Sequence, residues 1–360
     1  MENFTWIALL KVALAGLTSG IIALRLIPSI NRIARSKGLL NIPGERTSHR
    51  HKTPNLAGIS IFIAFCCSSL FFITDLFETF RVVFLASIII FFVGLKDDIV
   101  AISPGKKLIA EITAAVLVAA VGNIRFIHTY NFLGIENLND VTSIIITVVV
   151  IITIVNAVNL IDGIDGLAAA IGVLILGVFG MFFFVNGMFS RSVYCASMIG
   201  ALVAFFQYNV FGLRNKTFMG DSGSLLLGLT IAVVTIRFWE TNAEPNLFLT
   251  FSYAPAIAFA VLIIPIFDVI RVFLYRIIRG SSPFMADRNH LHHRLIDVGF
   301  SHLQATGILF ALNMLMIGIA FGLSLFFGMI WIVLTLLVLM ILFTYCINKF
   351  IINGKKLENQ

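Results

Sequence analysis

The sequence predicts an all-α polytopic membrane protein with about eleven transmembrane helices, and three observations lead to this class. Hydrophobic residues make up 59% of the 360 residues and charged residues only 12%, whereas soluble domains carry roughly 25% charged residues. The apolar runs approach the roughly 17–25 residues that a helix needs to cross a bilayer, rather than the roughly ten of a barrel strand. No polar stretch is long enough to fold alone, so we expect one integral-membrane domain over residues 1–360.

The expected spans follow one another along the chain with short connections. Their approximate bounds are 4–27, 56–74, 80–95, 108–122, 141–158, 167–186, 192–212, 222–238, 253–275, 303–327 and 329–348. Tilt and glycine-rich loops can accommodate the shorter ones. The first run lacks a basic start and a small-residue cleavage site, so we expect a retained span rather than a signal peptide.

Basic residues are distributed unequally between the two sides that these spans define. Eighteen Lys and Arg fall in the connections after the odd-numbered spans and in the C-terminal tail, and four fall in the other connections. Because Lys and Arg concentrate in cytoplasmic loops, the N-terminus is predicted outside and the C-terminus in the cytoplasm. This orientation explains the net charge of +7 without a nucleic-acid partner. The four cysteines lie in apolar runs, so neither a disulfide nor zinc is predicted.

The polar clusters of the chain all lie on the predicted cytoplasmic side. They occupy five connections, residues 28–55, 96–107, 156–166, 213–223 and 276–301. The opposite connections carry only scattered polar residues. The sequence therefore predicts that the five segments converge on one site at the cytoplasmic edge of the membrane.

Asp97 and Asp98 stand where the third span leaves the bilayer. Adjacent carboxylates repel each other, so they share a proton or require a cation or hydrogen-bond donor nearby. Lys106 and Lys107 can supply that charge, or can bind an anion themselves. An acidic helix end among solvated loop charges is the alternative interpretation, and it is the commoner one for an isolated pair.

Asn156, Asn159 and Asp162 follow one another at intervals of three residues, which places neighbours in the series on one face of a helix. Amide and carboxylate oxygens are ligands suited to Mg²⁺ or Mn²⁺. Gly163 and Gly166 allow a turn that brings backbone N–H groups close to a ligand. A simple helix cap is the alternative, but a cap needs one such residue rather than several.

Asp221 and Ser222 directly precede a hydrophobic run. Either residue is a good N-cap, and the same geometry directs free N–H groups at a phosphate. Ser222 can cap the helix while Asp221 binds a metal ion. The Gly-Asp-Ser-Gly sequence also suggests a serine hydrolase, but the nucleophile-elbow pattern is absent and no strand precedes it.

Three histidines, His290, His292 and His293, lie beside Arg288 in the fifth connection. They could bind a transition metal. Imidazole N–H groups with a neighbouring guanidinium fit the oxygens of a phosphate at least as well. Solvated loop histidines are the third interpretation. His49 belongs to a smaller basic group in the first connection.

The ordered motifs GLKDD, NAVNLIDGIDGLA, FMGDSGSL, PIFD and ADRNHLHHRL closely resemble those of a known family. The family is the polyprenyl-phosphate N-acetylhexosamine-1-phosphate transferases, the WecA/TagO group of the superfamily that also contains MraY. The resemblance covers nearly the whole chain. It implies transfer of a sugar phosphate, most simply N-acetylglucosamine 1-phosphate, from a UDP-N-acetyl sugar to undecaprenyl phosphate in the bacterial inner membrane, with release of UMP.

The resemblance also implies roles for individual residues, motif by motif. Asn159 and Asp221 match the Mg²⁺ ligands, and Lys106 or Lys107 matches the residue that holds the carrier phosphate. Further catalytic positions are Asp97, Asp98, Asp162 and Asp165, and further substrate-binding positions are Asn156, His49, Arg288, His290, His292 and His293. Direct attack by the carrier phosphate and a two-step route through an aspartyl intermediate both remain open, and a homodimer is compatible with the sequence.

Two residues depart from the family pattern, and three other functions compete. Ala57 precedes Gly58 where a Gly-Gly pair is usual, and Glu111 stands where glutamine is expected. The His-Leu-His-His motif differs from the consecutive histidines of MraY, which disfavours a phospho-MurNAc-pentapeptide transferase. A transporter is disfavoured because its ionisable sites lie near the midplane and its halves often repeat. A CDP-alcohol phosphatidyltransferase requires an arginine that is absent after Asp162-Gly163.

Overall fold

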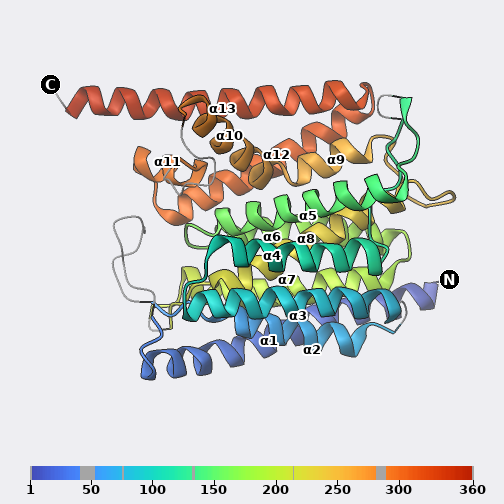
Figure 1. Ribbon diagram of the computed structural model, residues 1–360, viewed down its shortest axis with the longest axis horizontal. Helices are drawn as coiled ribbons and strands as arrows, with labels where there is room; N and C mark the ends of the chain where they lie inside the picture. The colour runs from blue at the N-terminus through green and yellow to red at the C-terminus, as the bar shows by residue number, and fades with distance from the viewer. Residues whose placement is uncertain are drawn as a thin grey trace.

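Helices form the named elements of the described chain, and an isolated bridge joins His128 to Asn137. The computed structural model (Figure 1) describes residues 2–40, 53–74, 77–131, 134–213, 215–280 and 289–358. Its helices are α1 Glu2–Ser36, α2 Ala57–Phe72, α3 Phe77–Ile99, α4 Pro104–Val116, η1 Leu117–Val121, α5 Asp140–Ile161, α6 Leu167–Val185, α7 Phe189–Val210, α8 Gly220–Thr241, α9 Ala254–Val261, α10 Ile263–Ile278, α11 Leu291–Val298, α12 His302–Ser324 and α13 Met329–Glu358.

The predicted all-helical, multi-pass architecture is confirmed at the level of long apolar helices. Seven described helices are long and apolar enough to cross a membrane, and the bent pair α9–α10 makes eight if it counts as one span. A helix stands at each of the eleven predicted positions, although α2 has only 16 residues. The count of eleven and the orientation therefore stay predictions.

The single span predicted over 253–275 is wrong in one respect, because α9 and α10 meet at an angle of 77°. Pro265 has no N–H group and cannot bond the carbonyl of Val261, as a continuous helix would require. Asn313 of α12, which is fully buried, replaces that bond. Its Nδ2 donates to the Val261 carbonyl at 3.2 Å and its Oδ1 accepts from the N–H of Ile264 at 3.4 Å. A side chain from another helix thus provides hydrogen-bond partners for the backbone groups at the break, as the membrane interior requires.

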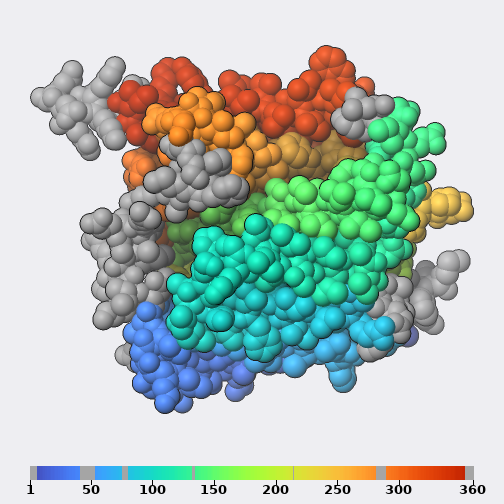
Figure 2. Space-filling model, in the orientation of Figure 1, coloured from blue at the N-terminus to red at the C-terminus, as the bar shows by residue number. Residues whose placement is uncertain are grey.

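Helix α8 is the centre of the bundle. Nearly all of its residues from Ser222 to Ile236 are buried, and it packs chiefly against α3 and α5, then against α2 and α6. The helix is apolar around its whole circumference, as expected for an element enclosed by other helices. In the space-filling view, α4 and α5 cover the front of the bundle and α13 runs along its upper edge (Figure 2).

The two ends of the bundle differ in their connections. Helix α1 begins at one end of the molecule and α13 finishes at the other, so the described chain starts and stops on opposite sides (Figure 1). The last turn of α3, the last turn of α5, the first turn of α8 and helix α11 lie toward one end. The 123–139 connection lies at the opposite end, where Glu240 accepts from the N–H groups of Ile127 and His128.

We predict that Asn313→Leu lowers the stability of the purified protein by about 2 kcal/mol or more. The substitution leaves a buried carbonyl and a buried N–H without partners, and each costs about 1–3 kcal/mol. Unfolding in mixed micelles measures this change. Thr335→Val is the matched control, because its hydroxyl bonds only a carbonyl of its own helix. An unchanged unfolding curve for Asn313→Leu would contradict the role of Asn313 at the bend.

Candidate active site

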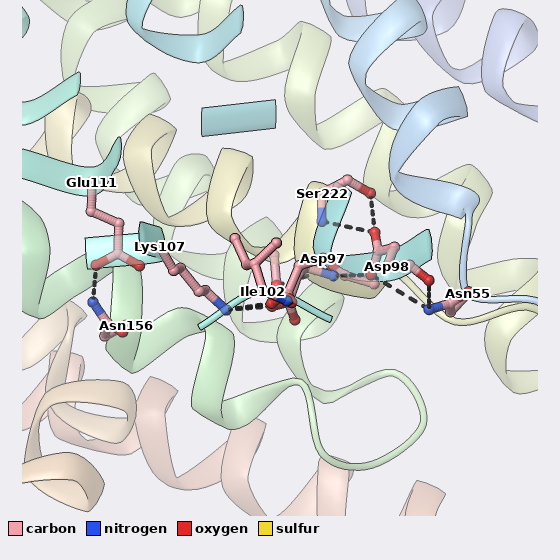
Figure 3. A network of polar contacts seen from close by, with 11 residues as sticks. Asn55, Asp97, Asp98, Ile102, Lys107, Glu111, Asn156 and Ser222 are labelled. Carbon is pink, nitrogen blue, oxygen red and sulfur yellow. Dashed lines mark hydrogen bonds and ion pairs between the residues drawn. The ribbon is translucent and has the colours of Figure 1, made fainter. Parts of the chain in front are cut away.

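The paired aspartates at the end of α3 meet the first turn of α8. Asp98 accepts three hydrogen bonds from that turn: Oδ1 from the N–H of Asp221 at 2.7 Å, and Oδ2 from the N–H and hydroxyl of Ser222 at 3.0 and 2.6 Å. Asn55 adds an amide donor at 3.5 Å to Oδ1 (Figure 3). Both oxygens of Asp98 are therefore engaged, and the carboxylate caps α8 from a neighbouring helix.

Glycines allow the end of α3 to lie this close to the first turn of α8. A Cβ on Gly94 would lie 2.6 Å from backbone atoms of Ser222, closer than real contacts allow. Gly220 has φ +71°, and a Cβ there would meet the Asn55 carbonyl at 2.2 Å and the Asp98 carboxylate at 2.6 Å. A side chain at either position would separate α3 from α8. The glycine of the GLKDD motif thus has a packing role that serves its aspartates.

Asp97 points to a different set of partners. Its Oδ1 accepts from the N–H of Ile102 at 2.8 Å, and its Oδ2 lies 3.6 Å from Nζ of Lys107. Figure 3 shows Lys107 directed toward Asp97. Lys107 also forms an ion pair with Asp221, so its ammonium group contacts two carboxylates. Lys106 is exposed, and its side chain makes no hydrogen bond or ion pair within the described chain. Of the two predicted lysines, Lys107 is the one at the carboxylates.

The two predicted asparagines of α5 differ in the hydrogen bonds that their side chains make. Asn156 donates through Nδ2 to the Glu111 carboxylate at 2.5 Å and to the Ile152 carbonyl at 3.0 Å, which leaves its Oδ1 available (Figure 3). The side chain of Asn159 makes no hydrogen bond within the described residues. Glu111 is only 3% exposed, so the residue that departs from the family pattern orients a predicted site residue.

The turn between α5 and α6 carries two of the predicted catalytic aspartates. Burial raises the pKa of Asp162 well above its usual range, and the negative charges of Asp221, Asp98 and Asp165 raise it further. Asp165 is held in place, because its Oδ2 accepts from Lys216 at 2.7 Å and lies 3.1 Å from Nδ1 of His302. Four carboxylates from three segments thus act on one another electrostatically at this end of the bundle.

The histidine cluster is positioned by a buried aspartate of α10. Asp268, which is 1% exposed, places Oδ2 at 3.0 Å from Nδ1 of His290. Its Oδ1 accepts from the N–H of Leu291 at 3.0 Å and from Arg271 at 2.8 Å. Asp268 therefore orients a predicted site histidine and caps α11 at the same time.

His292 packs directly on the turn that carries Asp162. A Cβ added to Gly163 would lie 2.3 Å from its Nε2, so glycine at that position admits the imidazole ring. The ring is 1% exposed and neither nitrogen has a hydrogen-bond partner within the described chain. Burial, with the neighbouring His293, lowers the pKa of His292 to about 3, so the ring is neutral. A neutral imidazole offers one donor and one acceptor to a ligand.

Two predicted residues, His49 and Arg288, lie outside the described residues. The others come from α3, α4, α5, the α5–α6 turn, α8 and α11, and their side-chain contacts form two groups. The first joins Asp97, Asp98, Lys107 and Asp221, and the second joins His290 and His292 through stacked rings 5.7 Å apart. His292 connects the second group to the Asp162 turn.

Side-chain oxygens of α5 and α8 could serve as ligands of a hard divalent cation. They belong to Asp221, Asn159 and Asn156, and the contacts of Asn156 leave its Oδ1 available. Within the described residues no three His, Cys, Asp or Glu side chains form a cluster that could hold a metal ion by themselves. Amide oxygens and substrate oxygens would have to complete the coordination, as is usual for Mg²⁺.

Comparisons with known proteins identify the family of this chain. The model of glycosyl transferase family 4 matches residues 80–239, from α3 to α8. The undecaprenyl-phosphate alpha-N-acetylglucosaminyl 1-phosphate transferases of Yersinia pestis and Escherichia coli (strain K12) are each 30% identical over 88% of this chain and 86% of their own. The protein of the same name from Pasteurella multocida is 34% identical over 76% of this chain and 75% of its own.

The long apolar helices and the named relatives together identify a multi-pass membrane phosphotransferase. Within that class, the chain belongs to the glycosyl transferase family 4 proteins named undecaprenyl-phosphate alpha-N-acetylglucosaminyl 1-phosphate transferases. The resemblance seen in the five motifs is thereby confirmed.

Sequence reasoning missed several residues that hold the site together. Asp268 appeared only as part of the PIFD motif, and Glu111 only as a departure from the family pattern. Lys216 and His302 gave no local signal, because their partner Asp165 is distant in the chain. Single buried charges within apolar runs are the signal that identifies Asp268 and Glu111, since such residues require partners.

We predict that Asp98→Asn lowers the free energy of unfolding by about 2 kcal/mol, because an amide cannot accept from both N–H groups of α8 and carries no charge. Asp97→Asn is the matched control at the adjacent position. Asp97 accepts from a single loop N–H, so its variant should unfold nearly like the wild type. Equal losses of stability in the two variants would contradict the capping role of Asp98.

Proposed function

We propose that this chain transfers N-acetylglucosamine 1-phosphate from UDP-N-acetylglucosamine to undecaprenyl phosphate at the cytoplasmic face of the bacterial inner membrane. The observation that carries the proposal is the meeting of Asp97, Lys107 and Asp221 at one end of an apolar bundle. That placement allows a lipid-borne phosphate to meet a water-soluble nucleotide. The names of the relatives favour N-acetylglucosamine over the peptide-bearing sugar of the MraY alternative.

Asn159 and Asp221 would hold Mg²⁺ or Mn²⁺, with Asn156 close by on the same face of α5. A bound divalent cation neutralises the charge of a diphosphate and makes its phosphorus more easily attacked. Glu111 keeps the amide nitrogen of Asn156 turned away, so the oxygen of Asn156 faces the ligand side. This donor set supports a metal-dependent transfer.

In the proposed reaction, an oxygen of the carrier phosphate bonds to the phosphorus that bears the sugar. The bond from that phosphorus to the bridging oxygen breaks, and the electron pair leaves with UMP. The product is a lipid-linked diphospho-sugar, the starting point of a surface glycan. A carrier phosphate is largely ionised near neutral pH, since a phosphate monoester has a second pKa of about 6, so attack does not require a general base.

Lys107 is the residue that we propose to bind the carrier phosphate. Its ammonium group already lies among oxygens of Asp97 and Asp221, and an incoming phosphate would compete for it. Asp97 would then orient the lysine or accept a proton from the carrier. Asp98 would act indirectly, by holding the first turn of α8 in place. Both of its carboxylate oxygens already accept hydrogen bonds from Asp221 and Ser222.

The histidines adjoin the Asp162 turn through His292, and we propose that they meet the phosphates of the nucleotide. His292 can donate from one ring nitrogen without losing an existing hydrogen bond. His290 is oriented by Asp268 at 3.0 Å. The proposed site thus separates the carrier side, at Lys107, from the nucleotide side, at α11.

We predict Mg²⁺-dependent transfer of labelled sugar phosphate from UDP-N-acetylglucosamine to undecaprenyl phosphate by the purified protein, with equimolar release of UMP. A panel of UDP-N-acetyl sugars compares the donors, and Asp221→Ala is the blank. We expect kcat/KM of this variant to fall about a hundred-fold or more, the size typical for losing a group that stabilises developing charge. Efficient transfer from another UDP-sugar alone would contradict the proposed donor.

We also predict that EDTA abolishes the transfer and that Mg²⁺ or Mn²⁺ restores it. Asn159→Ala should raise the Mg²⁺ concentration needed for half-maximal activity by about ten-fold or more, since it removes one proposed ligand. Asn186→Ala, at the opposite end of the bundle, is the control and should leave that concentration unchanged. Full activity in excess EDTA would refute the metal requirement.

A further inference from the structure

Helix α11, which carries the histidines of the site, is too short to hold its position alone. It spans Leu291–Val298, and a helix of about two turns is marginally stable without packing partners. It buries Leu291, His292 and Leu295, and it packs against α12 and α13. The position of its histidines therefore depends on contacts with other helices.

The first anchor of α11 is at its start. Asp268 of α10 accepts from the N–H of Leu291 at 3.0 Å and lies 3.0 Å from Nδ1 of His290. Arg271 of the same helix donates to the carbonyl of Asn289. These contacts fix the point where α11 begins. Contacts further along the helix must set the direction of its axis.

The second anchor is Arg294, which joins α11 to the last helix of the chain. Its Nη1 donates to Oδ1 of Asn348 in α13 at 2.7 Å, and its Nη2 donates to Oδ1 of Asn289 at 3.0 Å. A charged donor makes such bonds stronger than bonds between neutral groups. The last turns of α13 lie toward the same end of the bundle as α11 (Figure 1). One guanidinium group thus connects α13 to the segment that leads into α11.

Arg294 and His292 point in nearly opposite directions from α11. Residues two positions apart in a helix are separated by about 200° around its axis. His292 faces the α5–α6 turn, where a Cβ on Gly163 would lie 2.3 Å from its Nε2. Arg294 faces α13. Helix α11 therefore stands between the turn that carries Asp162 and the last helix.

The packing of His292 makes the site sensitive to the direction of α11. The buried ring lies against Gly163, where any side chain would collide with it. A tilt of α11 about its start would move this ring relative to the Asp162 turn. Loss of the bond between Arg294 and Asn348 would permit that tilt. The bond to α13 thus helps to set the distance between the histidines and the Asp162 turn.

We propose that Arg294 is a positioning residue for nucleotide binding, and that its bond to Asn348 makes α13 a support of the transferase site. The inference rests on the proposed function, since it takes the histidines to meet the phosphates of a nucleoside diphosphate sugar. Direct contact of Arg294 with the nucleotide is the competing role, because its Nε is buried without a partner among the described residues.

The test measures the Kd of UDP-N-acetylglucosamine for the full-length protein in detergent, by isothermal titration with Mg²⁺ and without the lipid carrier. KM values for both substrates are measured in the transfer assay. We expect Asn348→Leu, which removes the acceptor, to raise Kd about ten-fold, the equivalent of about 1.4 kcal/mol. KM for undecaprenyl phosphate should stay unchanged, because Lys107 belongs to α4.

Two further variants of α13 serve as controls. Asn348→Asp keeps an oxygen that can accept from Arg294, so it should bind the nucleotide sugar like the wild type. Tyr345→Leu lies one turn earlier on α13, and its side chain is exposed. It should also bind like the wild type. Weak binding by either variant would contradict the specific role of the Asn348 acceptor.

A double-mutant cycle separates positioning from direct contact. If Arg294 acts through α13, Arg294→Met and Asn348→Leu raise Kd by similar factors, and the double variant binds no worse than either. A higher Kd for Arg294→Met with no change for Asn348→Leu would overturn the proposal and assign a direct contact with the nucleotide. Equal increases in Kd and in KM for undecaprenyl phosphate would overturn it as well, because they indicate a general loss of structure.

Failure of this proposal and failure of the proposed function give different results. Transfer by the wild type with an unchanged Kd in Asn348→Leu contradicts only the role of Arg294. Nucleotide binding that depends on Asn348, without transfer by the wild type, contradicts only the proposed reaction. Absence of nucleotide binding by the wild type contradicts both.

Discussion

The arrangement of the active site depends on one interaction, the capping of α8 by a carboxylate from α3. Asp98 accepts the first free N–H groups of α8 at 2.7 and 3.0 Å and the hydroxyl of Ser222 at 2.6 Å. A helix end inside a membrane protein cannot leave such donors unpaired without a cost of several kcal/mol. Since α8 is enclosed by other helices, fixing its first turn also fixes Asp221 relative to Asp97 and Lys107. The glycines of α3 and α8 exist at this contact because a larger residue would hold the helices apart.

Polar contacts between segments also position other residues of the site. Several predicted residues are held by partners from other segments: Asn156 by Glu111, His290 by Asp268, and Asp165 by Lys216 and His302. Such partners fix the side chains before a substrate arrives, which is how phosphoryl transfer is catalysed by positioning.

The sequence predicted the helical class, the approximate position of each long apolar helix, and the segments that carry the site, because these depend on local apolar runs and polar interruptions. It did not predict the 77° break between α9 and α10, because the residue that makes the break tolerable, Asn313, lies about fifty positions away in the chain. The resemblance implied a catalytic role for both Asp97 and Asp98. Their different partners follow from the crossing of α3 and α8, which no local pattern encodes. Asp268 and Glu111 were visible as lone charges in apolar runs, but their partners were not.

A double-mutant cycle on Asp98 and Ser222 tests the central claim most directly. Unfolding free energies of the wild type, Asp98→Asn, Ser222→Ala and the double variant give the coupling between the two side chains. We predict a coupling of about 1–3 kcal/mol, the range of a charge-assisted hydrogen bond in a buried setting. A coupling near zero, with the two losses simply additive, would show that Asp98 does not hold the start of α8.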